Sequence, residues 1–296
     1  MLFIGKSKYS IEDVQVILDN YDTMTYLQIA KIINNKYGIE KFTEKQIRSK
    51  ARLLGLSKIK YHYNRRFFEN INTKEKAYWL GFLYADGYMI KTHRNAEVSI
   101  QLQASDKNHL EKFNSSIEGN VPTTEFLSKD SIIKTTGQVV RGTQICQIRL
   151  YSLDMANDLE GLKLLQNKTY ESVSPDLCYS NELNTAIVRG FFDGDGCIDK
   201  KGECHFTAYS TVFLDKVNEF LLSKNVKTTL YKETDKKHRL YIHTSSVLNF
   251  LTLLYNDDSY SYLDRKYNLA KQIIKQKKQK LMPKSPYTTV NLVNVV

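Results

Sequence analysis

Several residue types are scarce in this chain, and each shortage excludes a class of protein. Its 296 residues include only 4 cysteines, with no CxxC pair, which argues against a disulfide scaffold and for reduced thiols. Thirteen glycines and 4 prolines exclude collagen-like and low-complexity sequences. No apolar run approaches the roughly 20 residues of a membrane-spanning helix, and the first residues lack the features of a signal or transit peptide. We therefore expect a cytoplasmic protein without membrane contact.

Acidic residues are fewer than basic ones, 32 against 43, so the formal net charge is +11. This excess is concentrated in two places. Residues 41–66 carry nine Lys or Arg and one acid, and residues 265–284 carry eight and no acid, which leaves the remainder of the chain at −5. Two compact basic blocks favour nucleic acid as the partner, because they neutralise phosphates and release counterions.

Three short helical patterns occupy the first sixty residues, and each begins at a hydroxyl side chain. The expected N-caps are Ser10, Thr25 and Thr43, and Gly55 is the expected glycine after the third helix. The second pattern is expected to bury Leu27, Ile29, Ile32 and Ile33. The segment is similar to a small helix-turn-helix module.

The third of these helices has the pattern of a recognition helix, which enters the major groove of DNA. Its inward stripe is Ile47, Ala51 and Leu54, and its basic side chains point elsewhere. In this helix and the basic stretch after it, the predicted DNA-binding residues are Lys45, Arg48, Lys50, Arg52, Lys58, Lys60, Arg65 and Arg66.

An eleven-residue segment occurs twice, as AYWLGFLYADG at 77–87 and AIVRGFFDGDG at 186–196. Small residues recur with spacing i, i+4, i+8, which is one face of a helix. They are Ala77, Gly81 and Ala85 in the first copy and Ala186, Gly190 and Gly194 in the second. Such faces let two helix backbones approach closely, so we expect these two helices to pack against each other.

Each of the two helices ends in Asp-Gly, and we expect Gly87 and Gly196 to adopt the left-handed conformation of a helix cap. The expected N-caps are Asn72 for the first helix and Ser180 or Asn181 for the second. If the helices pack about a pseudo-twofold axis, Asp86 and Asp195 meet at the same end. Two carboxylates at helix C-termini repel each other unless a cation neutralises them, and Mg²⁺ suits such a site.

The nonapeptides WLGFLYADG (79–87) and VRGFFDGDG (188–196) resemble the paired motifs of single-chain LAGLIDADG homing endonucleases. The resemblance covers residues 73 to about 282. It implies site-specific cleavage of double-stranded DNA, with Asp86 and Asp195 as catalytic ligands of two or three shared Mg²⁺ ions. The residues before them, Ala85 and Gly194, are included in the predicted metal site.

Two positions depart from the motif. Tyr84 stands where the name-giving motif has its first Asp, a position that Asp193 fills in the second copy. Arg189 is a charge at a position that is normally apolar or small, and we expect it to point out of the helix interface toward a sheet edge or solvent.

The predicted fold class is α+β, with two pseudo-symmetric αββαββα halves after a small all-α domain. The expected parts are a helix-turn-helix domain at 1–60, a basic linker at 61–72, halves at 73–172 and 173–282, and a tail at 283–296. Alternating patterns predict strands whose outward residues suit a β-ribbon in a major groove. The outward candidates are Gln101, Gln103, Arg149, Tyr231, Lys232, Tyr241 and His243. Gln101 and His205 are expected at equivalent places in the two halves.

The two halves also end alike, around Lys168 and Lys266. Members of the resembled family keep a basic residue near the site that contacts the scissile phosphate or a water. Lys168 and Lys266 are accordingly the predicted catalytic lysines.

Together these patterns predict a monomeric, Mg²⁺-dependent DNA endonuclease that makes a staggered double-strand break. Two alternatives remain open, a non-catalytic DNA-binding regulator derived from the same scaffold and an intron RNA maturase, so intron RNA is a further candidate partner. The abundance of Lys, Asn, Ile and Tyr points to an AT-rich genome and a bacterial or phage-infected cell.

Overall fold

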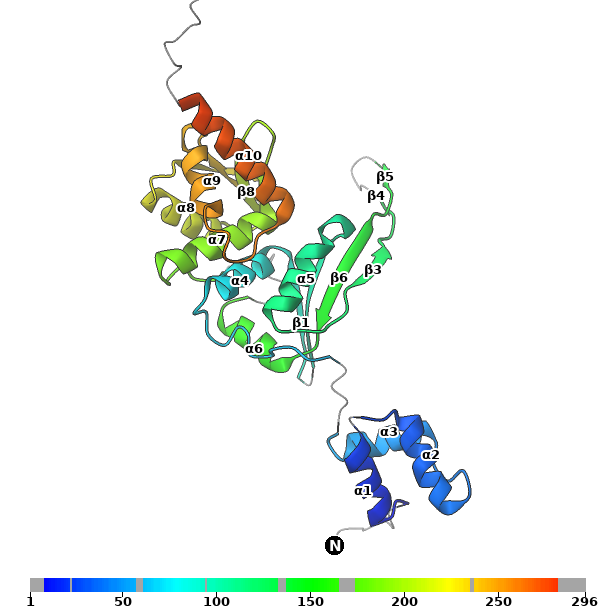
Figure 1. Cartoon of the computed structure of the whole chain (residues 1–296). Helices are drawn as coiled ribbons and strands as arrows, with labels where there is room; N and C mark the ends of the chain where they lie inside the picture. The colour runs from blue at the N-terminus through cyan, green and yellow to red at the C-terminus, as the bar shows by residue number, and fades with distance from the viewer. Residues whose placement is uncertain are drawn as a thin grey trace, which may run out of the picture. The chain divides into compact units, whose positions relative to one another are not determined.

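The chain divides into two compact units, Met1–His62 and Tyr63–Val296, which are described separately. The structure, a computed structural model, describes residues 8–21, 23–56, 61–93, 95–132, 137–164, 174–234 and 237–281 (Figure 1). Within these ranges, no helix is both long enough and apolar enough to cross a membrane.

The N-terminal unit contains three helices, α1 (Ile11–Asn20), α2 (Tyr26–Tyr37) and α3 (Glu44–Leu53). Ser10, Thr25 and Thr43 are their N-caps, as predicted, and each takes part in a reciprocal capping box with the residue three positions later. These caps satisfy backbone N–H groups that have no partner inside the helix, so short polar segments become helical.

Helix α3 ends as the sequence predicted, with Gly55 in the left-handed region at φ 75°. The N–H of Leu56 donates to the carbonyl of Ala51 at 2.9 Å, which closes a Schellman turn.

The small core of this unit is formed from all three helices. Its buried members include Ile17, Ile29, Ile33, Ile47 and Ala51. The expectation that Leu27 and Ile32 share this core is wrong, since their side chains are 48% and 40% exposed. Ile29 and Ile33, four residues apart, already fill the inward stripe of α2, and Leu27 and Ile32 lie to either side of it.

The first half of the larger unit follows the predicted αββαββα order. Its elements are α4 (Lys74–Asp86), β1 (Gly87–Lys91), β2 (Ala96–Gln103), α5 (Lys107–Ser116), β3 (Thr124–Leu127), β6 (Gln144–Leu150) and α6 (Leu153–Gly161), with the short 3₁₀ turn η1 (Ala104–Asp106) before α5. A small hairpin of β4 (Ser131–Ile132) and β5 (Val139–Val140) lies within the insertion before β6. The four main strands form an antiparallel sheet in the order β1-β2-β6-β3.

The second half repeats this order. Its elements are α7 (Asn181–Asp195), β7 (Gly196–Ile198), β8 (Cys204–Ala208), α8 (Thr211–Ser223), β9 (Thr228–Thr234), β10 (Lys237–Ile242), the 3₁₀ turn η2 (Thr244–Ser246) and α9 (Val247–Tyr255). The sheet order is β7-β8-β10-β9, the counterpart of the first sheet. The fold is therefore α+β with two equivalent antiparallel sheets, preceded by helices, as the sequence predicted.

Two segments complete this unit. Residues 63–72, assigned to a linker from sequence, belong to it: Phe67 and Phe68 are buried, and the N–H of Asn64 donates to the carbonyl of Ile117 at 2.7 Å. A further helix, α10 (Asp264–Leu281), follows α9 and packs against it (Figure 1). Ala270 and Ile273 form its buried stripe.

Candidate functional site

Helices α4 and α7 pack through their small residues. A Cβ added at Gly81 would lie 2.0 Å from the carbonyl oxygen of Ile187, and one at Gly190 would lie 2.0 Å from that of Tyr78. Nearer the C-terminal ends, a Cβ at Gly194 would lie 2.2 Å from the Cβ of Ala85. Ala77 and Ala186, at the other end of the two small faces, are fully buried. The two backbones therefore touch, which only glycine permits at these positions.

Asp86 and Asp195 are the last residues of these two helices. The prediction that Gly87 and Gly196 are left-handed is wrong. Both are extended, with φ −75° at Gly87 and −84° at Gly196, because the chain continues directly into β1 and β7. Glycine is required for space instead. A Cβ at Gly87 would lie 2.5 Å from the carbonyl oxygen of Leu83, and one at Gly196 would lie 2.4 Å from that of Phe192.

The two carboxylates lie at the same end of the helix pair. A Cβ at Gly194 would be 3.2 Å from the Oδ2 atom of Asp86, so the Asp86 carboxylate lies against the residue that precedes Asp195. Asp195 is exposed and Asp86 is half-buried. A cavity of about 130 Å³, lined in part by Tyr84, Ala85 and Asp195, lies beside them. This end of the pair is therefore open to a ligand.

The donor set fits Mg²⁺. Within the ranges that the structure describes, no group of three or more His, Cys, Asp and Glu side chains could hold a metal. Asp86 and Asp195 offer two carboxylates, and Mg²⁺ is commonly bound in this way, by one or two carboxylates together with waters and phosphate oxygens. A site that offered Cys or several His would instead favour zinc.

Lys266 does not extend into solvent. Its side chain is buried, and its ammonium donates to the backbone carbonyls of Phe192 at 2.6 Å and Gly194 at 3.4 Å, as well as to that of Gly196. Burial lowers the pKa of Lys266 to about 8, while the negative charges of Asp193, Asp86 and Asp195 oppose this. The predicted phosphate-contacting lysine is thus placed as a cap on the C-terminal end of α7. Lys168 lies outside the described residues.

Tyr84, which replaces an acid of the motif, is almost fully buried. Its ring contacts those of Phe191 and Phe213, with centroids 5.8 and 4.7 Å away. Burial, with the negative charge of Asp195, raises the pKa of Tyr84 to about 12, so the phenol stays neutral near neutral pH.

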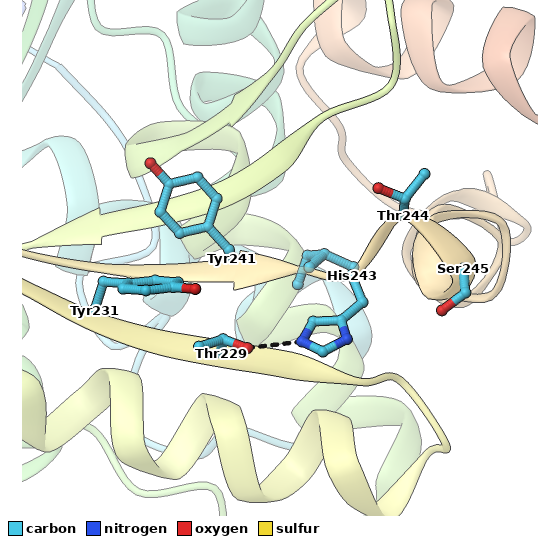
Figure 2. A pocket seen from close by; sticks show the side chains of 7 residues that line it. Thr229, Tyr231, Tyr241, His243, Thr244 and Ser245 are labelled. Carbon is cyan, nitrogen blue, oxygen red and sulfur yellow. Dashed lines mark hydrogen bonds between the residues drawn. The ribbon is translucent and has the colours of Figure 1, made fainter.

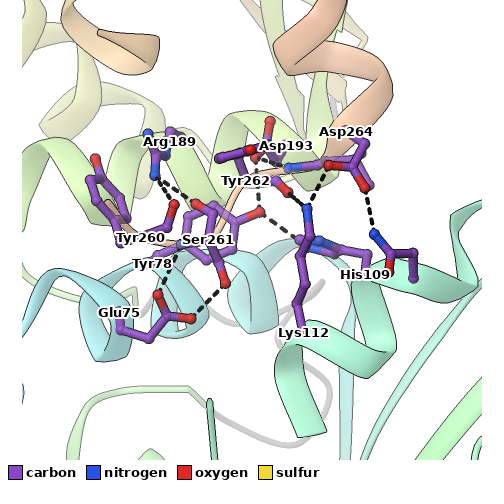
Figure 3. Close-up of polar contacts among 12 residues, drawn as sticks. Glu75, Tyr78, His109, Lys112, Arg189, Asp193, Tyr260, Ser261, Tyr262 and Asp264 are labelled. Atoms are coloured by element: carbon purple, nitrogen blue, oxygen red, sulfur yellow. Dashed lines mark hydrogen bonds and ion pairs between the residues drawn. The ribbon is translucent and has the colours of Figure 1, made fainter. Parts of the chain in front are cut away.

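Arg189 was expected to point toward a sheet edge or solvent, and this is wrong: its side chain is 0% exposed. The guanidinium donates to the carbonyls of Tyr260 at 2.8 Å and Ser261 at 2.6 Å (Figure 3). It also donates to those of Leu254 at 3.0 Å and Asp257 at 2.6 Å. It also stacks over the Tyr260 ring, 3.4 Å from the centroid. The acceptors are the last carbonyls of α9 and those of the segment that leads to α10, so Arg189 holds this connection in place.

Asp193 lies fully buried at the centre of a polar network that the sequence did not reveal. Its carboxylate accepts from the hydroxyl of Tyr78 at 2.8 Å (Figure 3). It also accepts from the hydroxyl of Tyr255 at 2.6 Å and from the N–H of Leu263 at 2.9 Å. Tyr78 also bonds the His109 Nε2 atom at 3.1 Å. Burial raises the pKa of Asp193, against the charge of Lys266 and these hydrogen bonds. The sequence signal for this network is the presence of an acid, Asp193, and an arginine, Arg189, inside an otherwise apolar helix.

Glu75, in the first turn of α4, ties the same region together. Its carboxylate accepts from the Ser261 hydroxyl at 2.5 Å (Figure 3). It also accepts from the Ser116 hydroxyl at 2.5 Å and from the Nε1–H of Trp79 at 2.7 Å. Four elements of the two halves thus share one hydrogen-bonded region: α4, α5, α7 and the segment before α10.

Strand register corrects one predicted equivalence. Tyr88 pairs with Ser99, and Cys197, the counterpart of Tyr88 in the second repeat, pairs with His205. His205 is therefore equivalent to Ser99 rather than to Gln101. The sequence alone aligned the two strands on the helices that follow them, but Ser99 lies eight residues before α5 and His205 only six before α8.

The outward faces of the two sheets carry different chemistry. On the first, Gln101 lies opposite Gln147, and Arg149 donates to the Gln147 Oε1 atom at 2.9 Å. The predicted contacts Gln101, Gln103 and Arg149 are exposed there. This face is rich in amides.

The second face is aromatic and hydroxyl-bearing. Tyr241 lies between His205 and Tyr231, with ring centroids 5.0 and 5.5 Å away. A cavity of about 800 Å³ opens here, and in it the His243 Nε2 atom and the Thr229 hydroxyl are 2.7 Å apart (Figure 2). The side chain of Lys232 lies outside the described residues.

The predicted basic contacts near the N-terminus vary in exposure. Lys45, Arg48 and Arg52 are exposed on α3 and Lys50 is half-buried, while Lys58 and Lys60 lie outside the described residues. Arg48 forms an ion pair with Glu44. Arg65 is exposed, whereas Arg66 pairs with Glu69 at 2.7 Å and Asp158 at 2.8 Å within the larger unit.

Residues 182–255 match the family model described as a LAGLIDADG-like domain, a range that contains the second motif copy. Among solved structures, the chain is similar to I-DmoI in complex with DNA and Ca (14% identity, 71% of this chain, 99% of that chain, TM-score 0.46). It is also similar to mesophilic variants of the homing endonuclease I-DmoI (15% identity, 70% of this chain, 99% of that chain, TM-score 0.45). A third similar structure is full-length DUF199/WhiA from Thermatoga maritima (13% identity, 75% of this chain, 68% of that chain, TM-score 0.41). None of the curated protein sequences matches the chain.

Proposed function

We propose that this chain, whose residues 182–255 form a LAGLIDADG-like domain, is a metal-dependent, site-specific DNA endonuclease that makes a staggered double-strand break. The observation that carries the proposal is the position of Asp86 and Asp195. Each is the last residue of one of two glycine-packed helices, and both lie at the same end of the pair. Two carboxylates held this close are unfavourable without a cation.

Asp86 and Asp195 would hold the divalent ions, and Mg²⁺ fits the two carboxylates best. When bound, such an ion stabilises negative charge on a phosphate and lowers the pKa of a bound water. The backbones of Ala85 and Gly194, packed against each other, fix the separation of the two acids.

Other residues of the chain support this end of the helix pair. Lys266 caps the carbonyls of Phe192, Gly194 and Gly196, and so fixes the last turn of α7 beneath Asp195. Tyr84 closes the side of the site with a neutral, buried phenol.

DNA would lie along the outward faces of the two sheets, because β1 and β7 begin directly after Asp86 and Asp195. The exposed Gln101, Gln103 and Arg149 suit hydrogen bonding to base edges. The exposed Lys45, Arg48 and Arg52 of α3 would add contacts to phosphate or base.

The test is cleavage of a library of duplex targets with Mg²⁺ by the wild type, Asp86→Asn and Asp195→Asn. We expect metal-dependent cutting by the wild type and a loss of at least about a thousandfold in each variant, with duplex binding retained. Asp154→Asn, which changes an exposed acid at the start of α6, is the matched control and should cut normally.

Duplex binding without cutting by the wild type, under any divalent ion, would refute the enzyme and leave a DNA-binding regulator. Specific binding of intron RNA with rescue of splicing would instead support the maturase.

A further inference from the structure

Helix α9 has two different faces. Val247, Phe250, Leu251 and Leu254 are buried beneath the second sheet, where the Phe250 ring lies 5.8 Å from that of Phe206. The opposite stripe, which includes Asn249, Thr252, Leu253 and Asn256, points away from the sheet. This stripe therefore lies on the back of the second half, behind the face that carries Tyr231 and Tyr241.

Two adjoining cavities follow that stripe. One, of about 790 Å³, extends past the N-terminal ends of α4 and α7, and the other, of about 350 Å³, lies between α9 and α10. Thr252, Asn256 and Lys278 line both. The two cavities thus form one groove, which we name the back groove.

The back groove is positively charged. Its lining includes the lysines Lys74, Lys224, Lys271, Lys275 and Lys278. Among the residues that the structure describes, two acids line it, Glu182 and Asp257. Lys74 pairs with Asp257 at 2.7 Å and holds the pKa of that carboxyl well below its ordinary value, so Asp257 remains paired and charged.

The α10 lysines form a row along the groove. Lys271, Lys275 and Lys278 have spacing i, i+4, i+7, so they follow one face of the helix at intervals of about 4.5–6 Å along its axis. Flexible ammonium groups at such intervals can neutralise successive phosphates of a strand.

Between the lysines, the groove offers amides that can both donate and accept. These are Asn225, Asn249 and Asn256 with Gln279. Amide side chains pair with the edges of unpaired bases, whereas a duplex presents a convex rod that does not enter a groove between two helices.

We propose that the back groove binds an unpaired nucleic-acid strand through its phosphates and base edges, at the same time as duplex DNA occupies the sheet faces. The positive charge and the amide groups of the lining favour a nucleic-acid strand over an apolar peptide. The site is separate from the Asp86–Asp195 end, so it does not depend on nuclease activity.

The test measures binding of labelled U12 and dT12 oligonucleotides and of a random duplex to the full-length protein by fluorescence anisotropy. The groove variant is Lys271→Gln, Lys275→Gln and Lys278→Gln, which keeps helix propensity while removing three charges. The matched control removes three exposed charges that lie outside the groove and outside the predicted DNA contacts: Lys31→Gln, Lys129→Gln and Lys200→Gln. Far-UV circular dichroism checks that both variants are folded.

We expect the groove variant to lose about tenfold or more in strand affinity, with a salt slope reduced by about 2, and to keep its duplex affinity. The control variant should keep its strand affinity. A preference for U12 or for dT12 identifies the sugar, and either supports the proposal.

Three results would overturn the proposal. One is equal loss of strand affinity in both variants. Another is displacement of the strand by the duplex. The third is displacement by poly-glutamate of matched charge, which would mark the groove as a general polyanion surface.

Discussion

The two halves of the larger unit share a topology, but their paired helices carry different side chains, most clearly at one position. Tyr84 of α4 reaches the opposite half through a ring contact with Phe213 of α8. Its counterpart in α7, Asp193, reaches across through Tyr78 to His109 of α5. His109 packs on Phe82 much as Phe213 packs on Phe191, with ring distances of 4.6 and 4.8 Å. Equivalent places in the two halves are therefore filled by aromatic contacts on one side and by buried hydrogen bonds on the other.

The difference teaches that the repeat constrains backbones more than side chains. A Cβ added at Gly81 or at Gly190 would lie at the same distance, 2.0 Å, from equivalent carbonyl oxygens. The residues that surround them are free to differ, provided that every buried polar group finds a partner. On the polar side, Asp193 and Arg189 also anchor the segment before α10.

Substituting the two glycines tests whether the halves are equivalent where they touch. Gly81→Ala and Gly190→Ala should each reduce the free energy of unfolding by about 4 kcal/mol or more, because backbone atoms cannot yield to the added methyl. Urea denaturation followed by circular dichroism measures this. Gly161→Ala, where nothing lies within 4 Å, should be neutral. A large effect at only one of the two interface glycines would break the equivalence.

Substituting the differing position should give unequal effects. Asp193→Ala leaves the hydroxyls of Tyr78 and Tyr255 and the N–H of Leu263 without their acceptor, and should cost about 3 kcal/mol of unfolding free energy. Tyr84→Phe removes only a hydroxyl and should cost less than about 1 kcal/mol. Equal costs would mean that the polar network does not stabilise the fold.

His109 should make the polar side sensitive to acid. Burial lowers the pKa of His109 to about 3. Between pH 6.5 and 3 the unfolded chain therefore binds a proton there that the folded chain does not. The resulting stability is complete above pH 6.5 and is lost as the pH falls, by at most about 1.4 kcal/mol per pH unit.

His109→Phe, which copies the aromatic side, should flatten that dependence. Tyr78 keeps its bond to Asp193 in this variant. The quantity to measure is the difference between wild type and variant in unfolding free energy from pH 7 to pH 4, so that other carboxylates cancel. An unchanged pH profile would show that His109 does not titrate in this way.

Local sequence signals were sufficient for much of the fold. The repeat at a fixed offset predicted two equivalent halves and the helix pair, since small residues at i, i+4 and i+8 have few other uses. The hydroxyl residues Ser10, Thr25 and Thr43 predicted helix starts. The N-cap of the first motif helix is Thr73 rather than the predicted Asn72. The N-cap of the second is Ser180, one of the two predicted residues.

Side-chain roles that depend on distant partners could not be predicted. Arg189 looked out of place in an apolar helix because its acceptors lie 65 to 72 positions later in the chain. Lys266 was predicted to contact the scissile phosphate, because nothing in its own helix shows that it lies over the end of α7. Such pairings follow from tertiary packing, which leaves no periodic signal in either segment.

The crossing of Asp193 and Tyr84 into opposite halves has a consequence for modularity. A chimera built from two second halves would set each Asp193 against a phenylalanine, with no Tyr78 or His109 to receive it. One built from two first halves would set each Tyr84 against a histidine. The halves are thus complementary rather than interchangeable. A symmetric protein made from one half would need the position of Tyr84 or Asp193 and the helix that faces it to be redesigned together.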